Sequence, residues 1–155
     1  MDKIVHHGLK LDLHIHSCVS SPKDGSKVKN NTIDNIPLLI SKLNVQGVNL
    51  CAITDHDAFS YEMYTALKKA ETQYNSVQKV FPGVEFSVSI LDSESKAKTI
   101  HVVAIFSDKD EEKIAAIETV LNKYSPDKDN AFNEETFLRI LREIDLDTIL
   151  IPITG

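Results

Sequence analysis

The chain has 155 residues, of which 42% are hydrophobic and 26% are charged, and its formal net charge is −6. This is the composition of a globular protein, and residues 1–155 are expected to form a single domain with one core. The acidic balance disfavours a broad basic surface for nucleic acid, although bound divalent ions would add positive charge locally.

The sequence has no apolar run of the ~18–20 residues that a membrane span requires, and its start lacks the apolar segment of a secretory signal. We therefore expect a cytoplasmic protein with no membrane contact and with reduced cysteines. Cys51 lies in an apolar run and is expected to be a small buried hydrophobe. Cys18 closely follows a pair of histidines, so a zinc-ligand role stays open for it, although it has no Cys-x-x-Cys partner.

Residues 9–16, with the sequence LKLDLHIH, alternate strictly between apolar and polar side chains. This period of two predicts a β-strand. Side chains two apart on a strand lie on one face, roughly 6.5–7 Å apart. His14 and His16 are therefore expected to project together from the polar face at the C-terminal end of the strand, where they could grip a metal ion.

The rest of the chain reads as alternating helices and strands. In chain order we predict a loop at 17–32, a helix at 34–46, a strand at 48–53, a helix at 61–75, a strand at 77–84 interrupted by Pro82 and Gly83, a hairpin of 86–91 and 99–106, helices at 110–123 and 133–144, and a strand at 147–152. This order is typical of an α/β protein built around a parallel sheet.

Imidazoles and carboxylates collect where the predicted strands end. His14 and His16 end the first strand, and Asp24 lies in the loop after it. The other members of the group follow the second and third strands, namely Asp55, His56, Asp57 and Glu85. In a parallel array the C-terminal ends of the strands open on one side, where the sites of barrels and open α/β sheets lie. Imidazole and carboxylate groups form the ligand set of Zn²⁺, Mn²⁺ or Fe²⁺, so the pattern predicts a shared metal site.

Each motif also has a plainer interpretation. Asp55 or Asp57 could cap the helix that follows, and Glu85 could be a solvated carboxylate. Because such residues occur at the ends of three predicted strands, a shared metal site is favoured over these separate interpretations. His101 lies near the start of its predicted strand, and geometry alone does not decide whether it reaches the same rim.

Four segments then stand out together: DLHIHS at 12–17, AITDHD at 52–57, PGVE at 82–85 and IHVV at 100–103. In this order and at these spacings they resemble the PHP (polymerase and histidinol phosphatase) family, and the resemblance covers residues 9–106. It implies a distorted, TIM-like β/α barrel of seven strands. It also implies phosphoester hydrolysis by metal-activated water at two or three divalent ions, acting on a phosphorylated small molecule or a nucleic-acid end.

The resemblance also assigns roles to individual residues. The metal ligands that it implies are His14, His16, His56, Glu85 and His101. Asp24, with Gly25, resembles an Asp-Gly ligand motif of the family, although the spacing from the histidine pair is longer here. Asp55 or Asp57 would orient a ligand imidazole through its second nitrogen.

The family pattern continues with a histidine after the fifth strand and an Asp-x-His pair on the last one. Here residues 149–155 contain no histidine, and none follows His101. We therefore expect a partial barrel of about five strands, truncated at its C-terminus, with a further domain in the full-length protein and weak or absent turnover from these residues alone. Pairing of two copies of the chain would cover the open edge. The alternative function is a non-catalytic metal-binding module that serves regulation or assembly.

Overall fold

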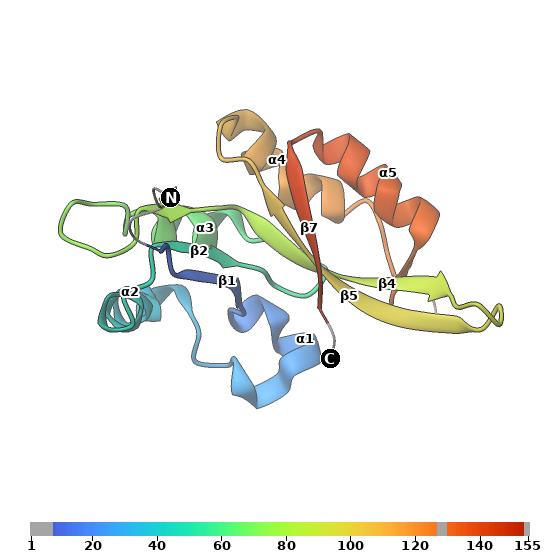
Figure 1. Ribbon diagram of the computed structural model, residues 1–155, viewed down its shortest axis with the longest axis horizontal. Helices are drawn as coiled ribbons and strands as arrows, with labels where there is room; N and C mark the ends of the chain where they lie inside the picture. Colours follow the sequence, from blue (N-terminus) through green and yellow to red (C-terminus); the bar gives the residue numbers. More distant parts are fainter. Residues whose placement is uncertain (1–7, 127–129, 154–155) are drawn as a thin grey trace, which may run out of the picture.

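The computed structural model describes residues 8–126 and 130–153. In these residues, two sheets are formed (Figure 1). The first has the order β1-β2-β3, with β1 at Leu11–Ile15, β2 at Leu50–Ile53 and β3 at Lys79–Val80. The second has the order β6-β4-β5-β7, with β4 at Gly83–Leu91, β5 at Ala97–Phe106, β6 at Phe132–Asn133 and β7 at Thr148–Ile153.

The α-helices are α1 (Ser21–Asp24), α2 (Ile36–Val45), α3 (Tyr61–Lys68), α4 (Glu111–Leu121) and α5 (Glu134–Ile144). Short 3₁₀ turns lie at Cys18–Ser20, Gly25–Lys27 and Ile33–Asn35. Helices α3, α4 and α5 each follow a residue whose side chain accepts a hydrogen bond from the first turn, namely Ser60, Asp110 and Asn133. These caps satisfy backbone donors that a helix start otherwise leaves unpaired.

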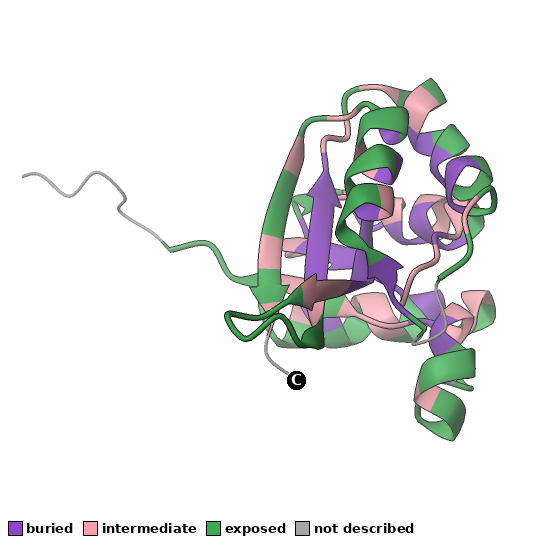
Figure 2. Cartoon of the chain, turned by 90° about the vertical axis from the view of Figure 1, so that its right-hand side faces the viewer, coloured by how far each residue is buried: buried purple, intermediate pink, exposed green. Residues whose placement is uncertain are grey.

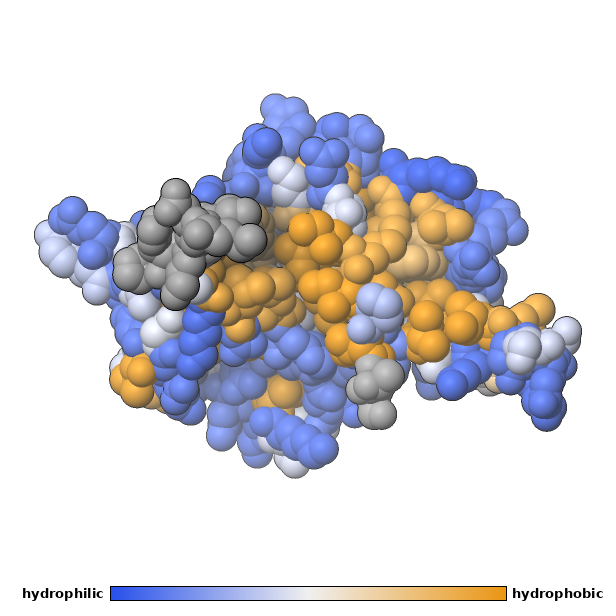
Figure 3. Space-filling model, in the orientation of Figure 1, coloured by the Kyte–Doolittle hydropathy of each residue, from blue (hydrophilic) through white to orange (hydrophobic). Residues whose placement is uncertain are grey.

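The main core lies between the strands and the helices that cover one of their faces (Figure 2). On β4, Val84, Phe86 and Val88 are buried in this core, and the Phe86 ring lies 5.1 Å from that of Phe137 on α5. Because side chains alternate along a strand, Glu85 points to the opposite face. The helices of the main core do not cover that face, and apolar side chains extend across it (Figure 3).

The α/β class is confirmed, but the expected partial TIM-like barrel of about five strands is not: the strands of the described residues divide into a three-stranded and a four-stranded sheet, and the sheets are not uniformly parallel. The first sheet is parallel, as is the pairing of β4 with β6. Strand β5 pairs antiparallel with both β4 and β7. The reason is local: β5 is the return arm of the predicted hairpin, so it runs against its neighbours.

The predicted strand at 77–84 is divided by Pro82 into β3 and the start of β4. Glu85 therefore lies near the beginning of a long strand and does not end one. The predicted helix at 61–75 stops at Lys68, after which the chain turns and the Asn75 side chain donates to the Ala70 carbonyl. The predicted loop at 17–32 contains α1 and two 3₁₀ turns.

Strand β1 does not keep the strict alternation that the sequence predicts. Its pairing with β2 shifts between Asp12, which lies opposite Cys51, and Ile15, which lies opposite Ile53, so β1 carries one extra residue. Such a bulge changes the side to which the following side chains point. Leu13 packs in a small second cluster, whereas Ile15 packs against the main core. The prediction that the apolar side chains of this strand share one face is therefore wrong beyond Asp12.

The two sheets meet where β2 ends and β4 begins. His56 forms a parallel bridge with Glu85, the Glu85 amide donates to the Asp55 carbonyl at 3.0 Å, and the Asp57 amide donates to the Glu85 carbonyl at 2.8 Å. Gly83 makes the approach possible, because a Cβ on it would lie 2.7 Å from Cγ2 of Thr54. The junction fixes Glu85 beside the end of the first sheet.

None of the helices in the described ranges is long and apolar enough to cross a membrane.

The close approach at Gly83 predicts that Gly83→Ala lowers the free energy of unfolding by roughly 1–3 kcal/mol, the usual cost of overpacking. Urea unfolding followed by circular dichroism measures the change. Gly8→Ala is the control, because a Cβ there would meet no atom of the described residues within 4 Å. Equal stability of the two variants would contradict the tight junction.

Candidate metal centre

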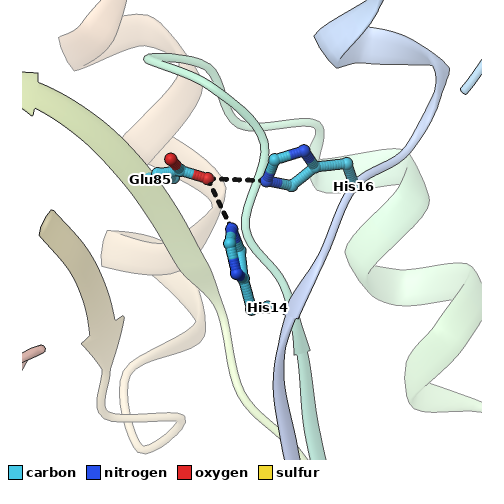
Figure 4. Close-up of side chains that lie close together, drawn as sticks. All are labelled: His14, His16 and Glu85. Atoms are coloured by element: carbon cyan, nitrogen blue, oxygen red, sulfur yellow. Dashed lines mark hydrogen bonds and ion pairs between the residues drawn. The ribbon is translucent and has the colours of Figure 1, made fainter. Parts of the chain in front are cut away.

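The first half of the candidate site is formed by β1 and β4. The side chains of His14 and His16 point toward Glu85 (Figure 4). Their Nε2 atoms lie 2.7 Å and 2.6 Å from the same carboxylate oxygen, Oε2 of Glu85. The sequence-based prediction that this histidine pair converges is confirmed, and the point of convergence is the carboxylate of the third motif.

The second half lies on the other oxygen of the same carboxylate. His101 Nδ1 is 2.5 Å from Glu85 Oε1, and His56 Nδ1 is 3.5 Å from it. His101 reaches this point because β5 is reversed: the N-terminal half of β5 runs beside β4, where His101 pairs with Ser87. His101 therefore does reach the same rim as the other candidate ligands, which the sequence alone did not decide.

Asp24 joins the cluster from the end of α1. Its Oδ2 lies 2.6 Å from His16 Nδ1, and its Oδ1 lies 3.3 Å from His56 Nε2. The ring of His16 is thus held between two carboxylates, one at each nitrogen. The longer spacing from the histidine pair does not keep Asp24 away, because α1 and the flanking 3₁₀ turns fold the segment back toward His16.

Glu85 carries a charge in a position that is only 1% exposed. Burial alone would raise the pKa of its carboxyl group, but the hydrogen bonds from three histidines outweigh that effect and lower the pKa to about 2. The pKa of His16 is raised by its hydrogen bond to Glu85, is lowered by burial, and is raised again by the bond to Asp24, with a net increase from 6.5. In the absence of a metal ion, hydrogen bonds from the imidazoles compensate the buried carboxylate.

The arrangement fits divalent metal ions. Three groups of side chains have ligand atoms within 4.8 Å of one another: His14, His16 and Glu85; His16, Asp24 and His56; His56, Glu85 and His101. His56 Nδ1 is buried and has no hydrogen-bond partner among the described residues. Buried polar atoms are nearly always paired, and a coordinated ion would supply the missing partner. Imidazole nitrogen with carboxylate oxygen suits Zn²⁺, Mn²⁺ or Fe²⁺.

An open cavity of about 570 Å³ exposes this cluster. It is lined by the four histidines, by Glu85, and by Pro152 and Ile153 of β7. The side chain of His14 is 47% exposed, so the site is most accessible at its β1 end.

Asp55 does not orient a histidine, which corrects one expectation from the sequence. Its Oδ1 accepts hydrogen bonds from the Ser17 amide and the Ser20 hydroxyl, both at 2.7 Å, and its Oδ2 accepts from the Ser17 hydroxyl at 2.6 Å. Ser20 Oγ in turn accepts from the His56 amide at 3.0 Å. Asp55 therefore anchors the segment that carries Asp24, and Ser60, not Asp55, caps α3.

Asp57 also has other partners than a histidine. Its Oδ1 accepts from the Ser87 amide at 2.7 Å, and its Oδ2 lies 2.5 Å from Nζ of Lys23. The roles of Lys23 and Ser87 could not be predicted from the sequence, because a lysine in a polar loop and a serine in a strand are both common. Their proximity to the cluster follows only from the folding of α1 against β4.

The cysteines lie outside the metal-binding groups that the described residues form. Cys51 is fully buried, as predicted, and burial raises the pKa of its thiol to about 12. Cys18 starts a 3₁₀ turn, and its amide donates to the Asn31 carbonyl. A zinc-ligand role for Cys18 is therefore not supported by this arrangement.

No protein-family model matches this chain, and no curated protein sequence is significantly similar to it.

The anchoring role of Asp55 predicts that Asp55→Ala lowers the free energy of unfolding by roughly 2–4 kcal/mol, because three buried donors lose their acceptor. Thermal and urea unfolding measure the loss. Asp34→Ala removes a carboxylate from an exposed position and serves as the control. A loss no larger than that of the control would contradict the anchor.

The raised pKa of His16 predicts a pH dependence for the metal-free protein. The interactions of protonated His16 stabilise the fold fully below its unfolded pKa of 6.5, and this contribution is lost as the pH rises through the raised value. Unfolding in the presence of a chelator should therefore occur more readily at about pH 9 than at about pH 6.

His16→Gln is the control for this effect, since glutamine does not titrate and the variant should show a flatter profile. With Mn²⁺ or Zn²⁺ in place of chelator the slope should reverse, because the ions compete with protons for the imidazoles. An identical pH profile with and without metal ions would argue against metal binding at His16.

Proposed function

We propose that this chain is a metal-dependent phosphoesterase domain that hydrolyses a phosphomonoester or phosphodiester with metal-activated water. The observation that carries the proposal is the position of Glu85. Each of its two carboxylate oxygens faces a different pair of imidazoles, His14 and His16 on Oε2 and His56 and His101 on Oε1. A carboxylate shared in this way suits two neighbouring divalent ions, as in two-metal hydrolytic sites.

In this proposal Glu85 would serve as a ligand at both positions, and one histidine pair would complete each of them. Asp24, between His16 and His56, adds a ligand to either position or holds a third ion. Divalent ions supply Lewis acidity, which lowers the pKa of an attacking water and offsets charge on the phosphoryl oxygens. No protein nucleophile is required.

The substrate proposal follows from the shape and access of the site. The cavity is open and the His14 side chain that lines it is 47% exposed, so a phosphate group could enter while the rest of its molecule stays outside. A phosphorylated small molecule or a nucleic-acid end meets this requirement. The resemblance of four ordered segments to the PHP family supports the same reaction class.

The proposal is tested by metal content together with hydrolysis. Protein purified without chelator should contain about two ions of Zn²⁺, Mn²⁺ or Fe²⁺ per chain by inductively coupled plasma mass spectrometry. Glu85→Gln should lose most of this metal, because it removes the shared ligand. Glu62→Gln, at an exposed position on α3, should retain it.

Hydrolysis of bis(p-nitrophenyl) phosphate with added Mn²⁺ should be slow and should disappear in His16→Ala. A chain that holds the metal but leaves every phosphoester intact would favour the non-catalytic metal-binding module. A chain that holds no metal, or whose metal content is unaffected by Glu85→Gln, would overturn the proposed site.

A further inference from the structure

A lysine that the proposed reaction does not yet use lies beside the metal centre. Lys23 belongs to α1 and precedes Asp24. Its Nζ is within hydrogen-bonding distance of three oxygens from three separate segments: Asp57 Oδ2 at 2.5 Å, Ser87 Oγ at 2.7 Å and the Asn130 carbonyl at 3.3 Å. The Lys23 side chain is 31% exposed, so the ammonium group is held in place but can still be reached from solvent.

The strand register places this ammonium next to the His101 end of the cluster. Ser87 lies directly opposite His101 in the β4–β5 ladder and two residues after Glu85, on the same face of β4. Directly opposed residues of antiparallel strands have Cβ atoms roughly 4.5–5.5 Å apart. An amine held on the Ser87 hydroxyl is therefore a near neighbour of the second proposed metal position.

We propose that Lys23, with the Ser87 hydroxyl beside it, binds a non-bridging oxygen of the substrate's phosphoryl group. The proposal further assigns the site a preference for phosphomonoesters, whose dianionic phosphate matches the additional positive charge better than a monoanionic phosphodiester does. It rests on the proposed function of the metal centre.

The charges around the site support this assignment. Asp24, Asp57 and Glu85 place carboxylates around the rim, and these would repel a phosphate unless cations offset them. Lysine carries three N–H donors and no acceptor. Its longest contact, the one to the Asn130 carbonyl, is the one that a phosphate oxygen would replace.

The competing explanation is that Lys23 only fastens α1 to β4 through its ion pair with the buried Asp57. The two explanations predict different effects of removing the other partner. If the ion pair only fastens α1 to β4, Asp57→Asn and Lys23→Met should weaken phosphate binding to a similar extent. If Lys23 binds phosphate, Asp57→Asn releases the ammonium from its carboxylate and should preserve or strengthen phosphate binding.

The test measures binding of inorganic phosphate to the Mn²⁺-loaded 155-residue chain by isothermal titration calorimetry, with metal content checked for each variant. Lys23→Met should weaken phosphate binding about tenfold or more, the usual effect of losing a charged hydrogen bond, at unchanged metal content. Lys23→Arg should retain most of the affinity. Lys29→Met, at an exposed position in the same segment, is the matched control and should bind as the wild type does.

Hydrolysis supplies a second readout that a fastening role would not change. Lys23→Met should reduce hydrolysis of p-nitrophenyl phosphate more than that of bis(p-nitrophenyl) phosphate, and should raise KM more than it lowers kcat. If Lys23→Met does not fold, the double variant with Asp57→Asn takes its place. It leaves no buried charge unpaired and keeps an oxygen to accept the Ser87 amide.

The outcomes separate this proposal from the proposed function. Wild-type protein that holds metal but binds no phosphate would overturn both. Wild-type protein that binds phosphate while Lys23→Met binds it equally well, or while Asp57→Asn loses affinity as Lys23→Met does, would overturn the role of Lys23 and leave the metal centre standing.

Discussion

The structure depends on one buried carboxylate. Glu85 is almost inaccessible to solvent, and a charge in such a place is strongly unfavourable unless it is paired and hydrogen-bonded. Its partners are four imidazoles carried by β1, the end of β2 and β5. Because these segments belong to both sheets, the charge of Glu85 is compensated only when the two sheets are correctly placed relative to each other.

Several local features of the backbone serve this placement. Gly83 has no side chain, which lets β4 approach Thr54 at the end of β2, and the bridge between His56 and Glu85 joins the sheets there. The bulge in β1 turns Ile15 into the main core. Asp55 holds the segment that brings Asp24 to His16. The convergence of these candidate metal ligands is thus a consequence of the junction between the sheets.

Much of the site could be predicted from the sequence because it lies where apolar runs give way to polar residues. His14 lies near the end of β1, and His16 and His56 follow the ends of β1 and β2, whose strand character the sequence pattern indicates; the three side chains do converge on Glu85. His101 could not be placed from its own segment, since its position depends on the reversal of β5 against β4. The distinction between Asp24, which contacts two histidines, and Asp55, which contacts two serines, depends on how the 17–32 segment folds back.

The sequence allowed a similar share of the fold to be predicted. Periodicity indicated the class and most helices and strands, but it did not reveal the bulge in β1, because strict alternation in sequence says nothing of an extra residue in the pairing. The closed barrel implied by family resemblance is not formed by the described residues, whose strands divide into two sheets with an apolar face left open (Figure 3).

Anomalous X-ray scattering from crystals grown with Mn²⁺ tests the proposal that Glu85 is a ligand shared by two metal ions. We expect two strong peaks flanking the Glu85 carboxylate, one beside His14 and His16 and the other beside His56 and His101. Crystals in which the ion binds elsewhere, with the imidazoles still hydrogen-bonded to an ion-free carboxylate, would contradict it.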